Sequence, residues 1–429
     1  MMNAETLKRL LEESSADAWQ LCDTHTAGWE FYFIRHDLDQ NRVRDTRHLN
    51  VTVYRKSEDG RMLGSASQEI WPTCSEDEAR EIIEHLLSEA HYVQNPYYEL
   101  NDVSDNEEQE RPDVKKNAHD FIQAMQKVRE TDSEDINSYE IFTDCVERRL
   151  MNSNGLDVTD IWPRSMIEVI VNTRNSEHEI ELYRSYENGS CDAEALRNSL
   201  HKAMQYGRDR LIAEPTPMLG KEIPVLFSTD DSVKIYKYFA AHADASMKYQ
   251  KISQFEQGKD VVSDVKGDRL TLKARRSLEN SPRNAAHDAE GAPVRDEVLI
   301  EDGVMKKFLG SRKYSSYLGI KDSFMPGNYE ACGGVSSENE LRSGRYLEAV
   351  EFSDFQIDSA SGMIAGEIRL AYLHDGDTVR IVTGGSVSGN LRECAGNMRM
   401  SKEQTQYGNW LVPSVTLLSG AQITGKDEN

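Results

Sequence analysis

Residues 224–249 have the layout of a helix that could hold a catalytic metal ion, but they supply only one imidazole. A short apolar strand, 224–227, is followed by a polar turn, 229–232, whose residue types favour the start of a helix. Apolar side chains then recur at helical spacing, at Val233, Tyr236, Ala240, Ala243 and Met247. A hydrolytic zinc helix needs two imidazoles and a carboxylate that acts on the bound water. This helix offers His242 alone, so the sequence predicts a helix of the zinc-binding type without a working site.

The eleven histidines of the chain contain no HExxH and no HxxxH spacing. His178-Glu179 opens an alternating strand with no second histidine nearby, which favours a surface pair. His287 and Glu290 lie in a turn that also holds an aspartate and a glycine. A carboxylate next to a histidine can support a site, but turn geometry accounts for aspartate and glycine there equally well, so both interpretations stay open.

The serines and cysteines of the chain do not form a recognisable nucleophilic site either. There is no GxSxG, and Cys332 and Cys394 have no histidine near them in the sequence. The glycine pairs at 333–334 and 384–385 lack the strand, loop and helix order of a phosphate-binding loop. The residues taken alone therefore assemble no catalytic set.

Composition restricts the class of protein. The chain has 429 residues, 38% of them hydrophobic and 29% charged, which is enough for two globular domains. A net charge of -24 argues against a nucleic-acid surface. No apolar run is long enough to span a membrane, and the acidic amphipathic N-terminus does not resemble a signal peptide, so we expect a cytoplasmic location. Six scattered cysteines without a CxxC predict reduced, mostly buried thiols.

Residues 1–213 are predicted to form an N-terminal α+β domain. An acidic, polar loop is expected at 101–113. Helices are expected at 3–14, after a Ser75–Glu78 capping box, at 114–131 and from Asp192 to about Ala213. Strands are expected at 28–35, 48–56, 61–71, 138–152, 165–174 and 178–187.

Residues 214–223 are predicted to be a linker, because 214–224 hold three prolines and a glycine. Residues 224–429 then break into short strands separated by Gly, Ser and Asp, with helices near 308–317 and 387–397. The predicted fold class is α+β. It combines an N-terminal α/β sandwich-like domain, whose sheet is mostly antiparallel, with a C-terminal β-rich barrel or sandwich-like domain.

Several short motifs occur in a specific order over nearly the whole chain. Asp288-x-Glu290-Gly291-x-Pro293 is followed by the strand turn 300–305 and by Ser315-x-x-Leu318-Gly319. These motifs resemble those of the TldD/PmbA family. Other matching pieces are Asn95-Pro96-Tyr97 with Leu100, Asn152-Ser153-Asn154-Gly155, Phe352-Ser353, Gly366-Glu367, Ser388-Gly389-Asn390-Leu391, Pro413-Ser414 and Ser419-Gly420.

The resemblance implies the branch of the family that lacks zinc ligands. TldD-like chains carry HExxxH on the helix that opens the second domain, and a cysteine near the C-terminus. Here the three motif positions fall on Tyr236, Lys237 and Ala241, and His242 is one residue away. The cysteine is expected near 399–401, where there is none. Two histidines and a glutamate cannot be replaced by Tyr, Lys and Ala.

The resemblance therefore implies a PmbA-like (TldE-like), non-catalytic and metal-free subunit of a TldD-type metallopeptidase complex that cleaves unfolded peptides. Such a subunit would help to form the chamber and bind peptide. Zinc would reside in a TldD-like partner that carries HExxxH. The partner could instead be a second copy of the chain. Neither nucleic acid nor membrane is expected as a partner.

Two other functions remain open. The chain could be an active metallopeptidase whose ligands are displaced, for example to His242, His287 and Glu290. It could also be a homodimeric scaffold that binds peptide without activity.

Overall fold

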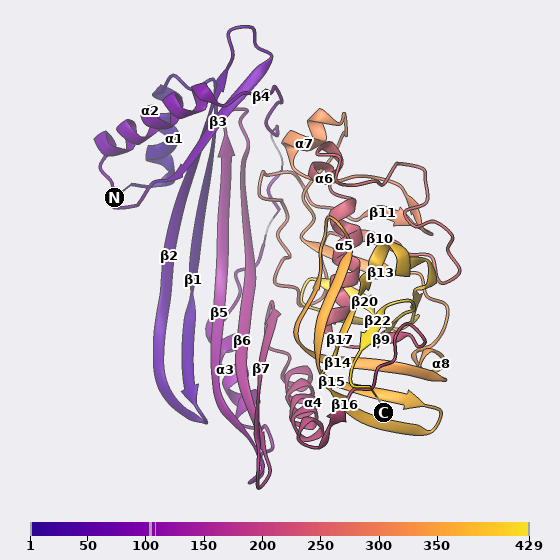
Figure 1. Cartoon of the computed structure of the whole chain (residues 1–429). Coiled ribbons are helices and arrows are strands. Elements are labelled where there is room, and N and C mark those ends of the chain that lie inside the picture. The colour runs from indigo at the N-terminus through magenta and orange to yellow at the C-terminus, as the bar shows by residue number, and fades with distance from the viewer. Residues whose placement is uncertain (1, 103–104, 108, 428–429) are drawn as a thin grey trace.

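The computed structural model describes residues 2–102, 105–107 and 109–427 (Figure 1). Its first half is built on one antiparallel sheet of seven strands, in the order β4-β3-β2-β1-β5-β6-β7. The strands are β1 (Ala18–Ile34), β2 (Asp37–Lys56), β3 (Met62–Glu69), β4 (Asn95–Pro96), β5 (Glu134–Asn152), β6 (Asp157–Arg174) and β7 (Glu179–Asn188). The sheet is accompanied by the helices α1 (Ala4–Glu13), α2 (Glu76–Tyr92), α3 (Val114–Met125) and α4 (Ala193–Ile212).

Several elements of this half differ in length from the sequence-based prediction. β1 begins at Ala18 rather than at residue 28, and β2 begins at Asp37 rather than at residue 48. The additional part of β2 is largely exposed, so it lacks the apolar alternation by which a strand is recognised. α3 ends at Met125 rather than near residue 131, where the chain turns toward β5.

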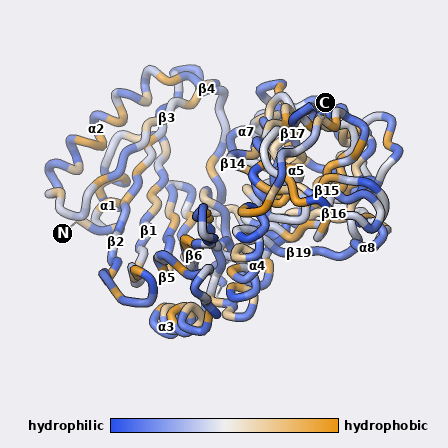
Figure 2. Tube along the Cα trace, turned by 60° about the horizontal axis from the view of Figure 1, so that its bottom comes forward, coloured by the Kyte–Doolittle hydropathy of each residue, from blue (hydrophilic) through white to orange (hydrophobic). Residues whose placement is uncertain are grey.

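The helices attach to the sheet through two separate apolar clusters. One cluster joins α1 and α2 to β1 and β2, and the other joins α3 and α4 to β5 and β6. Hydrophobic and hydrophilic positions alternate along α2, as expected for a helix with one face on the sheet (Figure 2). The predicted capping box of Ser75 and Glu78 is confirmed at the start of α2, and Asp192 caps α4.

The described part of the predicted acidic loop, 101–113, lies along β6. Asn106 accepts the backbone N–H of Thr159 at 2.6 Å and donates to the carbonyl of Asp157 at 3.0 Å. Gln109 donates to the Asp160 carboxylate at 3.2 Å. Residues 103, 104 and 108 of this loop lie outside the described residues.

The second half contains two more sheets. The six-stranded sheet has the order β12-β11-β10-β13-β20-β19, formed by β10 (Thr271–Arg275), β11 (Glu297–Glu301), β12 (Val304–Met305), β13 (Asn328–Cys332), β19 (Gln404–Tyr407) and β20 (Trp410–Pro413). The nine-stranded sheet contains β8 (Glu214–Pro215), β9 (Val225–Phe227), β14 (Arg345–Ile357), β15 (Met363–Asp375), β16 (Thr378–Thr383), β17 (Ser386–Asn390), β18 (Arg399–Met400), β21 (Thr416–Leu418) and β22 (Gln422–Thr424).

Neither sheet closes into a barrel within the part of the chain that the structure describes. The predicted α+β class is therefore confirmed, whereas the barrel alternative for the second half is wrong. Instead, one hydrophobic core joins both sheets to the helix α5 (Val233–His242), which contacts β14 of one sheet and β20 of the other. Each sheet instead keeps strands at its edges that have a neighbour on one side only, such as β12 and β19 in the six-stranded sheet.

The helices of the second half are shorter than predicted. The helix expected through residue 247 ends at His242, and α6 (Ala245–Tyr249) starts anew because Asp244 caps it. The predicted helix 387–397 begins only at α9 (Leu391–Cys394), since 386–390 form β17. The remaining helical elements are α7 (Arg312–Tyr317), α8 (Glu338–Leu341) and the 3-10 turns η1 (Asp230–Ser232) and η2 (Ala395–Asn397).

The connection 214–223 runs along the nine-stranded sheet. β8 pairs in parallel with β16, and Gly220 pairs with Ile423. The six cysteines are free thiols, as predicted, but only Cys145 and Cys394 are buried and the other four are half-buried. None of the described helices is long and apolar enough to cross a membrane.

Gly64 on β3 lies directly beneath the C-terminal end of α2, and this contact can be tested. A Cβ atom at Gly64 would lie 1.8 Å from the carbonyl oxygen of Ala90. We expect Gly64→Ala to lower the free energy of unfolding by about 1–3 kcal/mol, because the helix must move away. Ser65→Ala on the same strand is the control, with an expected change below about 0.5 kcal/mol. Equal urea midpoints for the two variants would contradict the close contact.

Candidate functional site

The first candidate site is α5, which lies between the two sheets of the second half. The helix follows η1, whose acidic residues suit a helix start. Tyr236 is fully buried, and its hydroxyl lies 2.6 Å from the hydroxyl of Thr416 on β21. Burial raises the pKa of Tyr236, so its phenol stays protonated. Lys237 is exposed, and Ala241 is half-buried.

His242, the last residue of α5, packs among aromatic rings. Its side chain is 1% exposed, with ring centroids 4.5 Å from Tyr238 and 5.1 Å from Phe255. Among the described residues, no hydrogen bond of ordinary geometry reaches either ring nitrogen. Burial and then the charge of Arg392 lower the pKa of His242, with the backbone of Ser359 partly offsetting them. The imidazole is therefore neutral near pH 7.

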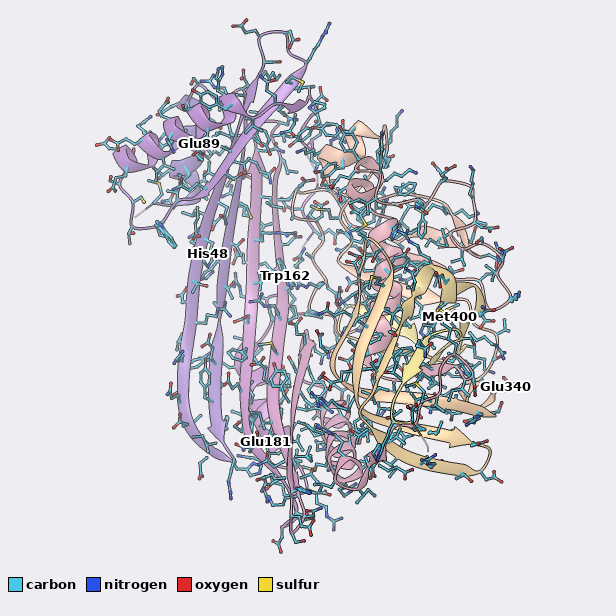
Figure 3. All side chains as sticks on the ribbon, viewed as in Figure 1. His48, Glu89, Trp162, Glu181, Glu340 and Met400 are labelled. Carbon is cyan, nitrogen blue, oxygen red and sulfur yellow. The ribbon has the colours of Figure 1, made fainter. Side chains whose placement is uncertain are left out.

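The C-terminal segment 399–401, where the resemblance places a cysteine, carries no thiol. Met400 is fully buried in the second half (Figure 3), and its backbone N–H donates to Asp268 at 2.7 Å. The Ser401 hydroxyl donates to the carbonyl of Glu403 at 2.8 Å. Cys394 lies earlier, on α9, where burial raises the pKa of its thiol.

These donors do not fit a zinc ion. The phenol of Tyr236 is protonated and engaged in the core, Lys237 carries a positive charge that repels a dication, and Ala241 has no donor atom. Across the residues that the structure describes, no three His, Cys, Asp or Glu side chains gather in a metal-binding group.

The second candidate site is the turn that holds His287, which meets the first-half sheet. His287 is 2% exposed, and its Nδ1 lies 3.1 Å from Oδ1 of Asp160 on β6. Asp160 also accepts the backbone N–H groups of Ala286 and His287, at 3.1 and 3.3 Å. Arg148 on β5 donates to Asp160 at 3.0 Å and to the carbonyl of His287 at 2.7 Å. His287 thus joins the two halves of the chain.

Charge and burial at Asp160 act in opposite directions. Burial favours the protonated acid, but hydrogen bonds from His287 and Arg148 outweigh it and hold the pKa of Asp160 below its usual value. The guanidinium of Arg148 also lies over the Trp162 ring, 5.3 Å from its centroid. The turn is therefore anchored by an ionised carboxylate that is fully buried.

The rest of the Asp288-x-Glu290-Gly291 motif forms the same join. The Asp288 carboxylate accepts the backbone N–H groups of Glu290, Ala292 and Met325, at 2.8, 3.0 and 2.8 Å. Gly291 has a φ of +83°, and a Cβ there would lie 2.3 Å from the side chain of Leu156 in the first half. Only glycine suits both the dihedral angle and the close approach.

Glu290 connects this turn to α7. Its carboxylate accepts the backbone N–H of Arg312 at 2.6 Å, and its carbonyl accepts the side-chain amide of Asn101 at 2.9 Å. Burial, followed by the nearby charge of Asp288, raises the pKa of Glu290 to about 7. His287 and Glu290 thus lie in one turn but contact different partners, Asp160 and the backbone of Arg312. His242 packs among aromatic rings at the end of α5 instead.

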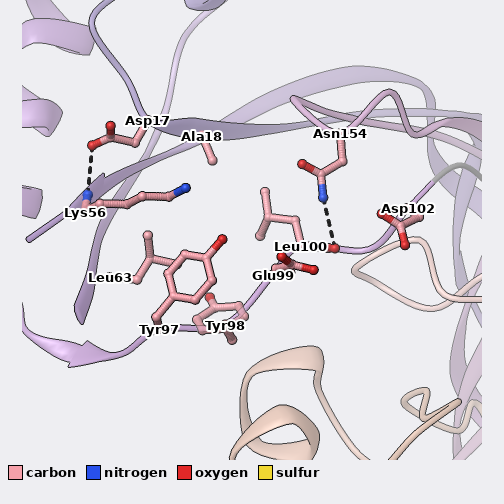
Figure 4. Close-up of a pocket in the computed structure, with 10 residues that line it drawn as sticks. All are labelled: Asp17, Ala18, Lys56, Leu63, Tyr97, Tyr98, Glu99, Leu100, Asp102 and Asn154. Atoms are coloured by element: carbon pink, nitrogen blue, oxygen red, sulfur yellow. Dashed lines mark hydrogen bonds between the residues drawn. The ribbon is translucent and has the colours of Figure 1, made fainter. Parts of the chain in front are cut away.

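A third site was not predicted from the sequence. A cavity of about 330 Å³ lies at one end of the first-half sheet (Figure 4). The sequence signal for it is the Asn95-Pro96-Tyr97 step with Leu100, one of the motifs that resemble the TldD/PmbA family. The lining residues come from separate segments and are Asp17, Ala18, Lys56, Leu63, Tyr97, Tyr98, Glu99, Leu100, Asp102 and Asn154.

The second half of the chain is similar to a known protein family, and the whole chain is similar in fold to solved structures. Residues 220–425 match the family model described as PmbA/TldA metallopeptidase C-terminal domain. No curated protein sequence matches the chain.

Solved structures match almost the entire fold at low sequence identity. TldE from Thermococcus kodakarensis matches with 17% identity and a TM-score of 0.76, covering 98% of this chain and 99% of that one. A putative modulator of a DNA gyrase from Thermotoga maritima matches with 16% identity and a TM-score of 0.75, over 98% and 99% of the two chains. A putative modulator of DNA gyrase from Bacteroides thetaiotaomicron matches with 15% identity and a TM-score of 0.77, over 99% and 98%.

The buried imidazole of His242 makes a prediction about stability at low pH. Because its folded-state pKa is lowered, the unfolded chain binds more protons below about pH 6.5, and the free energy of unfolding falls as pH falls. In His242→Leu this contribution, at most about 1.4 kcal/mol per pH unit, is lost, and stability declines less between pH 7 and pH 5. Urea unfolding at several pH values measures it, with exposed His119→Leu as control. An unchanged slope in His242→Leu would contradict a neutral His242.

The join at Asp160 makes a second prediction. We expect Asp160→Asn to lower the free energy of unfolding by about 3–5 kcal/mol, because Arg148 is left partly buried without its counter-charge. Amide hydrogen exchange across 286–292 should also become faster. Asp157→Asn, which breaks a more exposed pair with Arg149 on the same strands, should cost about 1 kcal/mol or less. Similar costs for the two variants would show that the join does not depend on Asp160.

Proposed function

The chain belongs, through its C-terminal domain at residues 220–425, to the TldD/PmbA metallopeptidase family, and from this premise we propose that it is the subunit without a zinc site in a two-chain peptidase. In this proposal a TldD-like partner that carries HExxxH supplies the metal and the catalytic base. The present chain completes the chamber and helps to bind unfolded peptides.

The observation that supports the proposal is the donor set on α5. The three positions that match HExxxH hold a phenol engaged with Thr416, an exposed ammonium and a methyl group. The neighbouring imidazole, His242, is enclosed by the rings of Tyr238 and Phe255 and is kept neutral by burial. This donor set supports a helix that holds no metal and activates no water.

The position of α5 also suits a subunit that shapes a chamber. The helix is held on both sides by sheets, while Lys237 and Ala241 remain at least partly accessible. A rigid helix of this kind can form part of a wall without taking part in chemistry. Peptide recognition by such a wall would depend on main-chain and shape contacts, which tolerate varied sequences.

The proposal is tested by elemental analysis of the purified chain after dialysis against a weak chelator. We expect far less than one zinc per chain and no peptidase activity. When an HExxxH-bearing family chain is co-expressed, we expect the two to co-purify, with about one zinc per pair and cleavage of unfolded peptides. Glu→Gln in the partner's motif should abolish cleavage, whereas His242→Leu in this chain should not.

Other results would favour the alternatives. One zinc per isolated chain, lost in His242→Ala, would overturn the proposal in favour of an active enzyme with displaced ligands. Peptide binding by a stable homodimer, with no cleavage in the presence of any HExxxH chain, would favour a scaffold without activity.

A further inference from the structure

The cavity at the end of the first-half sheet has the size of a small-ligand site. Its volume of about 330 Å³ lies at the lower end of the range for such sites. One side is formed by β1, β2 and β3, and the other by the segment 97–102 (Figure 4). None of the groups discussed for α5 or for the His287 turn lines it.

A single cation projects into this cavity. The ammonium of Lys56 lies 5.0 Å from the centroid of the Tyr97 ring. Among the described residues, no acidic side chain forms an ion pair with this ammonium group. The Asp17 carboxylate accepts the backbone N–H of Lys56 at 2.8 Å, so that acid is fixed to the strand rather than to the ammonium.

The carboxylates of Glu99 and Asp102 lie on the opposite side of the cavity. Neither carboxylate forms an ion pair within the described part of the chain. The cavity therefore carries one positive charge and three negative charges, counting Asp17. This balance disfavours phosphorylated ligands, whereas opposite charges on two sides suit a molecule that is itself a zwitterion.

The segment between these charges is held in place by other parts of the chain. Asn154 donates to the carbonyl of Leu100 at 3.1 Å, and Arg312 of α7 donates to the carbonyl of Glu99 at 2.9 Å. Tyr98 packs edge-on against Tyr54 and Tyr317, with centroids 6.4 and 6.1 Å away. The cavity is thus formed before a ligand arrives, which lowers the cost of binding.

We propose that this cavity binds the zwitterion of a free amino acid or dipeptide. The ligand's carboxylate contacts Lys56, its ammonium group contacts Glu99 and Asp102, and its side chain packs on Tyr97 and the neighbouring apolar residues. The binding rests only on this cavity. The source of the ligand, as a product of peptide cleavage, rests on the proposed function.

In the test, isothermal titration calorimetry measures the binding of three probes to the full chain. The probes are Ala-Ala, N-acetyl-Ala-Ala, which lacks the ammonium group, and Ala-Ala amide, which lacks the carboxylate. We expect Ala-Ala to bind at least about tenfold more tightly than either derivative, since each derivative loses one charged contact.

Two variants assign the contacts. Lys56→Gln should remove the preference for Ala-Ala over its amide, and Glu99→Gln should weaken the preference over the N-acetyl derivative. Lys127→Gln and Glu84→Gln, at exposed positions outside the cavity, should bind as the unaltered chain does. Circular dichroism checks that each variant is folded, and both altered side chains are exposed, so folding should be retained.

The inference is overturned if the three probes bind equally or if Ala-Ala gives no heat up to its solubility limit. It is also overturned if Lys56→Gln leaves the preferences unchanged. These outcomes are separate from those of the zinc and co-purification experiments, because the isolated chain is sufficient for the binding test.

Discussion

The buried carboxylate of Asp160 joins the two halves of the chain. Removing a carboxylate from water costs several kcal/mol unless charges and hydrogen bonds replace the lost hydration. Here Arg148 supplies the charge from the neighbouring strand, while the side chain and backbone of His287 supply hydrogen bonds from the other half. Because these donors come from both halves of the chain, the carboxylate ties the turn to the sheet at Asp160.

Other parts of the molecule take their position from this join. Glu290, three residues after His287, caps α7 through the backbone N–H of Arg312, and the side chain of Arg312 in turn holds the carbonyl of Glu99. Asn101 reaches back to the carbonyl of Glu290. The cavity wall at 97–102 is therefore fixed by the second half of the chain, although most of the cavity belongs to the first half.

Local patterns in the sequence were sufficient for much of the fold. The capping box at Ser75 and the cap at Asp192 depend on residues within a single turn, and both were predicted. The extension of β2 over 37–47 was not, because an exposed strand needs no apolar alternation. The break after His242 was missed because the cap formed by Asp244 starts a new helix within an unbroken apolar pattern.

The candidate sites were harder to predict because their partners lie far apart in the chain. Residue types alone left His287 open between a ligand and a turn residue, since its partner Asp160 is 127 positions away. The cavity has the same character: Lys56 and Glu99 come from different segments, and neither carries a local motif for binding. The resemblance to a family located α5, but only the contacts of Tyr236 and His242 describe what those side chains do.

The hydrogen bond between Tyr236 and Thr416 also bears on how such a chain can evolve. A position that faces a metal can lose its ligand and regain it by one substitution, as long as the space around it stays open. Tyr236 is instead fully enclosed by the core, with its hydroxyl matched to a strand from the end of the chain. Placing a histidine there would require several neighbouring residues to change together, so a single substitution is not expected to introduce a metal ligand at this position.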